Sequence, residues 1–258
     1  MGVVGGTYGV RILTALSPDG KSGLADGVAP AYRNRSKLEV LLGPDIWQQI
    51  RGKVVVDFGC GVGEEAVELV EHGAAHVIGV DISQRWLDHA AAVAAERGVA
   101  DRCTFVKEWS GPANADIVIS LDSFEHFNDP AAILRVMDGM LAPDGRVVAA
   151  FGPTWYHPYG GHLFSVFPWA HCVFSEAALL KWRESLPGKR PKATFLDAGL
   201  NKMTVRRFEK LIDESPFRFA AFEPVPIRKL RWAARFPLRE FTTSIVRCQL
   251  VKRGAGNP

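Results

Sequence analysis

The chain has 258 residues, a formal net charge of +3, and 47% hydrophobic and 23% charged residues. This is the composition of a folded protein with a substantial core, and so small a net charge argues against nucleic acid as a partner. No run of about eighteen apolar residues occurs, which argues against a transmembrane segment, and the four widely spaced cysteines fit neither a zinc site nor a disulfide framework, so we expect reduced thiols in a cytoplasmic protein.

The start of the chain has no signal-peptide pattern, because a basic first segment and a small-residue cleavage site are both missing. We expect residues 1–25 to form a flexible N-terminal arm, and a segment that covers a bound ligand is the alternative. Residues 26–258 are then expected to form one domain. Its first strand is predicted over KVVVDFG, residues 53–59, whose near-continuous apolar character is typical of a strand buried on both faces of a sheet.

Strands and helices alternate from this point to residue 152. The segments at 63–71 and after Ser83 have the apolar spacing of amphipathic helices, and Asp129 followed by Pro130 is typical of a helix start. This alternation with short connections predicts an α/β fold with a doubly wound, mostly parallel sheet. The further strands are predicted at 75–83, 103–107, 115–120 and 146–152.

The alternation breaks at residue 153. Residues 153–203 are rich in aromatic residues, histidine, glycine and proline, and we expect them to form a substrate lid inserted after the fifth strand. Gly160 and Gly161 predict a mobile turn in that lid. A helix over 204–214 and strands over 217–225 and 242–251 are expected to complete the domain.

Three alternate glycines, Gly59, Gly61 and Gly63, follow the first strand, at the place where open α/β sheets bind their ligands. A dinucleotide-binding turn needs glycine at position 64, but that residue is Glu64, and the pattern of a phosphate-binding loop does not occur. Glu64 and Glu65 would also repel a pyrophosphate at the start of the following helix. The turn therefore favours a ligand without phosphates.

Two acidic residues extend this site. Asp81 ends the second strand and can accept hydrogen bonds from both hydroxyls of a ribose, as acidic residues do at this place in nucleoside-binding folds. Asp57 can meet an ammonium group beside the glycine turn, in which Cys60 supplies a small side chain without reactivity of its own. An adenosine that carries a cationic amino-acid tail and no phosphates is S-adenosylmethionine, which we predict as the cofactor.

The segments VVVDFGCGVGEEAVELVEHGAAHVIGVDIS and ADIVISLDSFEHFNDPAAILRVMDGMLAPDGRVV, with their spacing, resemble class I S-adenosylmethionine-dependent methyltransferases. The resemblance covers residues 35–152 with specific motifs and 204–251 more loosely. It is strongest to the bacterial small-molecule branch that includes ubiquinone-pathway enzymes. It implies a Rossmann-like, seven-stranded sheet whose final strand, TTSIVRCQLVK, is antiparallel.

The same resemblance implies roles for individual residues. The methionine end of the cofactor would lie on Asp57 and the glycine turn, and the ribose and adenine on Asp81 and Ile82. Related sequences often place an aspartate after the third strand, but this stretch reads VKEWSG, so Glu108 or Trp109 would have to meet the adenine. The cofactor-binding residues predicted in this way are Asp57, Gly59, Cys60, Gly61, Gly63, Asp81, Ile82, Glu108, Trp109 and, near the sulfonium, Leu121.

Histidines in the expected lid are the candidates for contact with the methyl acceptor. His157 and His162 lie in WYHPYGGHLF, and either could take a proton from an acceptor hydroxyl as a catalytic base; the alternative is that both satisfy backbone groups and shape the lid. Glu125 and His126 are expected to brace the loop after the fourth strand. No metal site is predicted, because the spacing matches no metal-binding pattern.

We therefore expect an enzyme that methylates a small-molecule or glycan-type acceptor, first at oxygen, then at nitrogen or carbon. A protein that binds S-adenosylmethionine without transferring the methyl group is one alternative, and an NAD-dependent oxidoreductase is a weaker one. The basic and aromatic stretch RKLRWAARFPLR, residues 228–239, is expected to form a solvated helix packed by its apolar side. Weak contact with a membrane surface, or with an anionic substrate such as a phosphorylated or nucleotide-linked sugar, is the alternative. The sequence does not indicate an oligomeric state.

Overall fold

The computed structural model describes residues 2–22, 35–233 and 238–254 of the chain. Its centre is a seven-stranded sheet in the order β3-β2-β1-β4-β5-β7-β6. Strands β1 to β5 run parallel, and β7 runs antiparallel to its neighbours β5 and β6, which confirms the predicted sheet. The strands are β1 (Val54–Phe58), β2 (His76–Val80), β3 (Cys103–Val106), β4 (Ala115–Leu121), β5 (Leu141–Phe151), β6 (Phe217–Pro226) and β7 (Thr243–Lys252).

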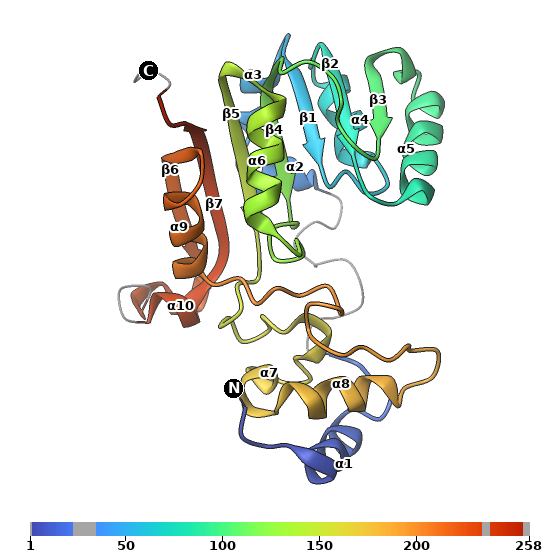
Figure 1. Cartoon of the computed structure of the whole chain (residues 1–258), viewed down its shortest axis with the longest axis vertical. Helices are drawn as coiled ribbons and strands as arrows, with labels where there is room; N and C mark the ends of the chain where they lie inside the picture. The colour runs from blue at the N-terminus through green and yellow to red at the C-terminus, as the bar shows by residue number, and fades with distance from the viewer. Residues whose placement is uncertain (1, 23–34, 234–237, 255–258) are drawn as a thin grey trace.

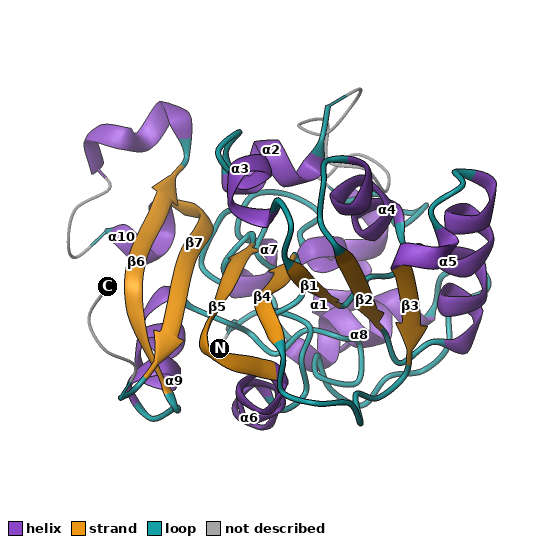
Figure 2. Ribbon diagram, turned by 90° about the horizontal axis from the view of Figure 1, so that it is seen from above, coloured by secondary structure: helices purple, strands orange, loops and turns teal. Residues whose placement is uncertain are grey.

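Helices cover both faces of the sheet, because successive residues of its buried strands point to opposite sides. In β1, Val55 packs in the cluster beneath helices α2 to α5, whereas Val56 packs in the cluster beneath α6 and α9. Figure 2 shows these two layers on either side of the sheet. The helices are α2 (Lys37–Leu42), α3 (Ile46–Ile50), α4 (Glu64–Glu71), α5 (Gln84–Glu96), α6 (Pro130–Met140) and α9 (Val205–Asp213), with a short 3₁₀ turn, η2 (Ala100–Arg102), before β3.

Side chains cap these helices where the sequence predicts it. Asp129 accepts a hydrogen bond at 2.9 Å from the backbone N–H three residues further on, and Pro130 takes the first helical position. Ser83 caps α5 in the same way. Helices α2 and α3 were not predicted; α2 follows Ser36, whose hydroxyl accepts from the N–H of Glu39. Such caps satisfy N–H groups that the first turn leaves unbonded, so local chemistry determines where these helices begin.

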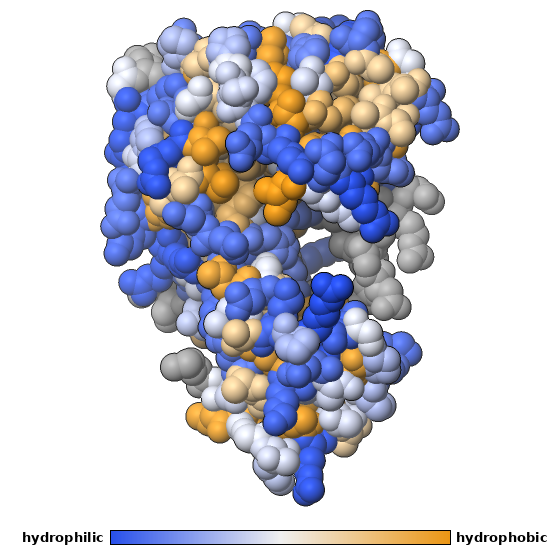
Figure 3. Space-filling model, turned by 45° about the vertical axis from the view of Figure 1, so that its right-hand side comes forward, coloured by the Kyte–Doolittle hydropathy of each residue, from blue (hydrophilic) through white to orange (hydrophobic). Residues whose placement is uncertain are grey.

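Helix α1 (Gly6–Leu16) and residues 153–203 together form a helical portion that we call the cap. Residues 153–203 contain η3 (His162–Phe164), α7 (Ala170–Val173) and α8 (Glu176–Glu184), and the cap has a hydrophobic cluster of its own. Figure 1 shows the cap beyond the carboxyl ends of the parallel strands. In Figure 3 the molecule narrows between the cap and the portion that contains the sheet. The cap therefore lies at the edge of the sheet where open α/β folds bind ligands.

The N-terminal segment is a packed part of the cap, so the expected flexible arm over residues 1–25 is wrong for its described part, residues 2–22. Leu13 is fully buried in the cap cluster, and the indole N–H of Trp182 in α8 donates to the carbonyl of Ser17 at 3.2 Å. Val4 pairs with Phe174 in a parallel bridge. These contacts join segments far apart in sequence. Their favourable free energy offsets the conformational entropy that the N-terminal segment loses when it is ordered.

Gly160 and Gly161 do not form the predicted mobile turn. Both are buried. A Cβ on Gly160 would lie 2.2 Å from the carbonyl oxygen of Thr154, and one on Gly161 would lie 2.3 Å from Cβ of His171. Both distances are far below ordinary van der Waals contact. These glycines are therefore required by close packing inside the cap.

The basic stretch at 228–239 includes η4 (Arg228–Ala233) and the start of α10 (Arg239–Thr242), and residues 234–237 lie outside the described part. Trp232 is 81% exposed, so it does not pack onto the sheet as the apolar side of a solvated helix would. Contact between this segment and a membrane surface stays a prediction. Among the described residues, we find no helix with the length and apolar character to cross a membrane.

We expect the Leu13→Ala variant to lose about 2–4 kcal/mol of unfolding free energy, because the substitution leaves a cavity in the core of the cap. Leu16→Ala is the matched control: Leu16 lies on the same helix with 55% exposure, and its loss should be below about 0.5 kcal/mol. Denaturant unfolding followed by tryptophan fluorescence measures both. Equal stability of the two variants would contradict the packed position of α1.

Candidate functional site

The glycine turn lies directly after β1, at the carboxyl edge of the sheet. The backbone N–H of Gly59 donates to the carbonyl of Val80 at 2.8 Å, which ties the turn to the end of β2. Gly59, Gly61 and Gly63 have φ angles of 88°, 49° and 84°, in the left-handed region that glycine adopts readily. A Cβ on Gly63 would lie 2.4 Å from Cβ of Ala90, whereas one on Gly61 would meet no heavy atom within 4 Å. Packing thus requires Gly63, while Gly61 faces open space for a ligand.

Asp81 joins the turn to the segment after β2. Its Oδ2 accepts a hydrogen bond from the backbone N–H of Gly61 at 3.1 Å, and its Oδ1 accepts one from the N–H of Ser83 at 2.8 Å. Each carboxylate oxygen keeps a second lone pair for a ligand. The structure thus places Asp81 beside the turn, as the sequence predicts. It also shows that Asp81 braces the turn, a role that the sequence did not indicate.

Asp57 is a buried carboxylate with an unused oxygen beside the turn. The residue is 4% exposed, and its Oδ2 has no hydrogen-bond partner among the described residues. Burial and then the charge of Glu65 raise the pKa of Asp57 to about 8, while Lys37 opposes the rise. Because a buried carboxylate without a partner is costly, this oxygen is suited to a cationic group of a ligand.

Lys37 belongs to this site and was missed by sequence reasoning. Its Nζ lies 3.2 Å from Oδ2 of Asp122 and 3.7 Å from Oε1 of Glu65. Burial lowers the pKa of Lys37, but Asp122 and Glu65 outweigh it and leave that pKa raised. The ammonium group partly neutralises Glu65. The expected repulsion of a pyrophosphate therefore depends mainly on Glu64, which is exposed.

The other predicted cofactor residues differ in exposure. Ile82 is 93% exposed, and Glu108 is also exposed. Trp109 is half-buried against the cluster beneath α6, and its indole nitrogen has no hydrogen-bond partner in the described part of the chain. Leu121 ends β4 and is buried. Cys60 is buried in the turn, and burial raises the pKa of its thiol, which fits a passive role. The cofactor contacts of these residues stay predictions.

The two cap histidines have different surroundings. Nδ1 of His157 accepts a hydrogen bond from the backbone N–H of Tyr159 at 3.1 Å, so the neutral ring carries its proton on Nε2. Nε2 of His162 is buried without a hydrogen-bond partner among the described residues. Burial lowers the pKa of both rings to about 4. Of the two, His162 is the neutral ring with an open lone pair.

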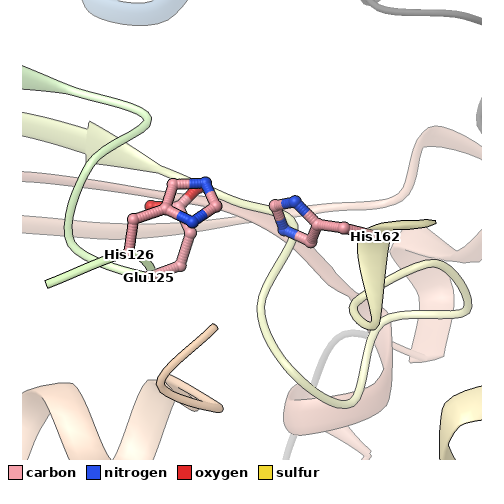
Figure 4. A group of neighbouring side chains, drawn as sticks. All are labelled: Glu125, His126 and His162. Atoms are coloured by element: carbon pink, nitrogen blue, oxygen red, sulfur yellow. The ribbon is translucent and has the colours of Figure 1, made fainter. Parts of the chain in front are cut away.

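His162 faces Glu125 and His126, which follow β4 (Figure 4). One potential ligand atom from each of the three side chains lies within 4.8 Å of the other two. The rings of His126 and His162 meet edge to face, with centroids 5.2 Å apart. The sequence did not predict this group, because only the fold of the cap brings His162 to the loop after β4.

Glu125 braces its loop, as the sequence predicts, but only one of its carboxylate oxygens is used. Oε1 accepts a hydrogen bond from the N–H of Gly152 at 3.2 Å, and the backbone carbonyl accepts one from Asn201 at 3.0 Å. Oε2 is buried and lacks a partner within the described residues. Burial and then the charge of Asp122 raise the pKa of Glu125 to about 8. Together with two imidazoles, this carboxyl group can bind a proton, a hydroxyl or a cation.

Two sets of groups thus lie at the carboxyl edge of one sheet: the glycine turn with Asp57 and Asp81, and the group formed by Glu125, His126 and His162. A solved S-adenosylmethionine-dependent methyltransferase shares this fold. A sequence model of the family described as a methyltransferase domain matches residues 30–186. The chain belongs to this methyltransferase family.

Curated relatives share part of the chain. The ubiquinone biosynthesis O-methyltransferase of Neisseria meningitidis serogroup C is 39% identical over 103 residues, which cover 38% of this chain and 43% of that protein. The chloroplastic tocopherol O-methyltransferase of Arabidopsis thaliana is 27% identical over 151 residues, which cover 57% of this chain and 39% of that protein. The matched region thus spans less than half the length of these relatives.

Solved structures share the fold at lower identity. An S-adenosylmethionine-dependent methyltransferase from Mesorhizobium loti has a TM-score of 0.54 at 19% identity and covers 82% of this chain and 97% of its own. The [4+2]-cyclase SpnF has a TM-score of 0.55 at 15% identity, covering 98% of this chain and 99% of its own. At such identities the likeness shows the fold, and in the second case it extends over nearly the whole chain.

Proposed function

We propose that this protein transfers a methyl group from S-adenosylmethionine to a small-molecule acceptor, with oxygen as the first choice of acceptor atom. The proposal depends above all on the glycine turn hydrogen-bonded to Asp81 beside the buried, unpartnered Oδ2 of Asp57. Membership of the methyltransferase family and the O-methyltransferases among the relatives support it. Nitrogen and carbon acceptors, and acceptors of the glycan type, are second choices.

The residues of the turn fit this cofactor. Oδ2 of Asp57 can accept a hydrogen bond from an ammonium group, and the second lone pairs of Asp81 can accept hydrogen bonds from ribose hydroxyls. The open space at Gly61 leaves room for the amino-acid tail, and Glu64 opposes a pyrophosphate there. When bound, the cofactor supplies a methyl group on a positively charged sulfur.

The reaction is a displacement at carbon: the acceptor oxygen forms a C–O bond, the C–S bond breaks with its electron pair left on sulfur, and the hydroxyl proton departs. We place the acceptor beside Glu125, His126 and His162, where the open Nε2 of His162 can take that proton. Residues 153–203 then act as a substrate lid that orients the acceptor and excludes water, and orientation alone can contribute about 7–11 kcal/mol to a reaction of two bound partners.

Reduced thiols support a cytoplasmic location for this activity. Cys60, Cys103, Cys172 and Cys248 are all free, which is typical of proteins in a reducing compartment. We therefore include the cytoplasm, as the location of the protein, in the proposal.

Incubation of the protein with methyl-labelled S-adenosylmethionine and a small-molecule extract tests the function. The expected result is label in a defined product, with one S-adenosylhomocysteine released for each methyl group transferred. Binding of the cofactor without release of S-adenosylhomocysteine, for every extract fraction, would support the alternative of a protein that binds the cofactor and transfers nothing. Tighter binding of NAD than of S-adenosylmethionine would contradict the assignment of the turn.

The Asp81→Ala variant is expected to bind S-adenosylmethionine with an affinity lower by about 1.5–3 kcal/mol, because ribose hydroxyls then lie beside an apolar wall. Calorimetry measures the affinity, and the melting temperature without cofactor reports separately on the lost bracing of Gly61. Asp88→Ala is the matched control: Asp88 is an exposed carboxylate on α5 and should leave the affinity unchanged. An Asp81→Ala affinity within twofold of wild type would contradict the ribose assignment.

A further inference from the structure

We propose that Glu125, His126 and His162 bind a divalent transition-metal ion, with zinc as the best-fitting one, where the cap meets the sheet. A carboxylate and two imidazoles are a donor set that zinc and related ions accept in proteins, with a further position open to water or substrate. The sequence predicted no metal site, since His162 lies 36 residues beyond His126 and no short spacing links the three residues.

Two of the potential donor atoms are buried and have nothing else to bind. Oε2 of Glu125 and Nε2 of His162 have no hydrogen-bond partner among the described residues, and Glu125 is 3% exposed. An unsatisfied buried polar atom costs about 1–3 kcal/mol. Two such atoms in one small group indicate a missing partner, and a cation suits both, because it can replace the carboxyl proton of Glu125 and accept the lone pair of the imidazole.

A backbone carbonyl orients the imidazole of His126 for an ion. Nδ1 of His126 lies 2.5 Å from the carbonyl oxygen of Gly199, and because a carbonyl oxygen only accepts, this nitrogen carries the proton and Nε2 keeps its lone pair. Metal-binding histidines typically donate their other ring N–H to a carbonyl or carboxylate in this way.

The group needs a small movement to close around an ion. Its potential ligand atoms lie within 4.8 Å of one another, whereas two ligands of a tetrahedral zinc ion are about 3.3 Å apart for bond lengths of about 2.0–2.1 Å. His162 comes from the cap, and Glu125 and His126 come from the loop after β4 (Figure 4). Closure would therefore bring the cap toward the sheet by on the order of an ångström, and the ion would hold the two portions together.

The open position of the ion is suited to the acceptor oxygen, a step that depends on the proposed function. A hydroxyl bound to a divalent ion would lose its proton to water more readily, which would make its oxygen a better nucleophile toward the methyl carbon. In the ion-loaded protein the Nε2 lone pair of His162 is held by the ion, and in the ion-free protein it is available as a base. Ion binding itself requires neither the acceptor nor the cofactor.

Titration of the chelator-treated full chain with Co²⁺, followed by visible absorption, measures the site directly, and displacement by Zn²⁺ gives the relative affinity. We expect one ion per chain. Glu125→Gln and His162→Ala should each weaken the affinity by more than about a hundredfold, because the loss of a ligand exceeds the cost of losing an outer partner. His157→Ala is the matched control and should bind as wild type, since Nδ1 of His157 is already bonded within the cap.

Glu125→Gln keeps an oxygen for the N–H of Gly152, so it removes the second carboxyl oxygen, which would bind the ion, while the bracing contact persists. Circular dichroism verifies the fold of each variant. Absence of stoichiometric binding, or equal binding by Glu125→Gln and wild type, would overturn the inference. Failure of methyl transfer with intact ion binding would count against the proposed function and leave the ion site supported. Methyl transfer at the full rate after removal of the ion would contradict the inference that the ion binds the acceptor oxygen.

Discussion

The His162→Ala variant is expected to methylate its acceptor more than a hundredfold more slowly than the wild type while it binds S-adenosylmethionine with unchanged affinity. The substitution removes the open Nε2 that faces Glu125 and His126. A positioned base contributes about 10²–10⁴-fold to a rate, and a ligand of an acceptor-binding ion has an effect of at least this order. Single-turnover transfer of labelled methyl, with the acceptor that the extract experiment identifies, measures the rate.

Two further variants make this result decisive. His162 has a φ of 50°, and asparagine tolerates this left-handed conformation better than alanine, so His162→Asn keeps the backbone favourable while it removes the imidazole. It should be as slow as His162→Ala. His157→Ala should retain at least about a tenth of the wild-type rate, because the Nδ1 of His157 is occupied by the N–H of Tyr159. Wild-type turnover in both His162 variants would limit this residue to shaping the cap.

The parts of the fold that depend on neighbouring residues could be predicted from the sequence. The apolar run 53–59 became β1, and Asp129 with Pro130 started α6, because burial on both faces and the capping of free N–H groups are local effects. Similar reasoning located the carboxyl edge and the glycine turn. Helices α2 and α3 were not predicted, although Ser36 and Glu39 show the spacing of a capping box before an apolar segment.

The insertion of residues 153–203 was predicted, but the internal packing of the cap was not, because its contacts join distant segments. The indole N–H of Trp182 donates to the carbonyl of Ser17 across 165 residues, and no pattern within residues 2–22 indicates that α8 will pack against this segment. Gly160 and Gly161 illustrate the same limit. Glycine allows both flexibility and close approach, and only the neighbours, Thr154 and His171, decide that close approach is the reason here.

The candidate site divides in the same way. Asp57, Asp81 and the glycine turn lie in one short motif whose chemistry can be read from residue type and order, and the hydrogen bond from Gly61 to Asp81 agrees with it. Lys37 reaches Glu65 and Asp122 only through the packing of α2 against the sheet. His162 likewise reaches Glu125 only through the path of the cap. Residue type suggested the histidine, but its partner depended on tertiary structure.

The Asp57→Asn variant is expected to gain stability over the wild type as the pH rises. The pKa of Asp57 is about 8 in the folded chain, against an ordinary value of 3.8 for aspartate, so between these two pH values the folded state holds a proton that the unfolded state has released. Stability must then fall with rising pH. Asparagine has the same shape and no charge, so the difference between variant and wild type should grow by about 1.4 kcal/mol per pH unit well below the folded pKa and by less near it, roughly 2 kcal/mol from pH 6 to pH 8.

S-adenosylmethionine should reverse this behaviour, because its ammonium group pairs with the ionised form of Asp57. The carboxyl group is mostly protonated at pH 7, since burial and Glu65 outweigh Lys37, so cofactor binding should release nearly one proton. Calorimetry in buffers of different ionisation enthalpy measures that number, and Asp57→Asn should abolish it. Glu64→Gln, at an exposed carboxylate of the same turn, should leave it intact. Proton release that persists in Asp57→Asn would show that another group meets the ammonium and that the unused Oδ2 is a feature of the core alone.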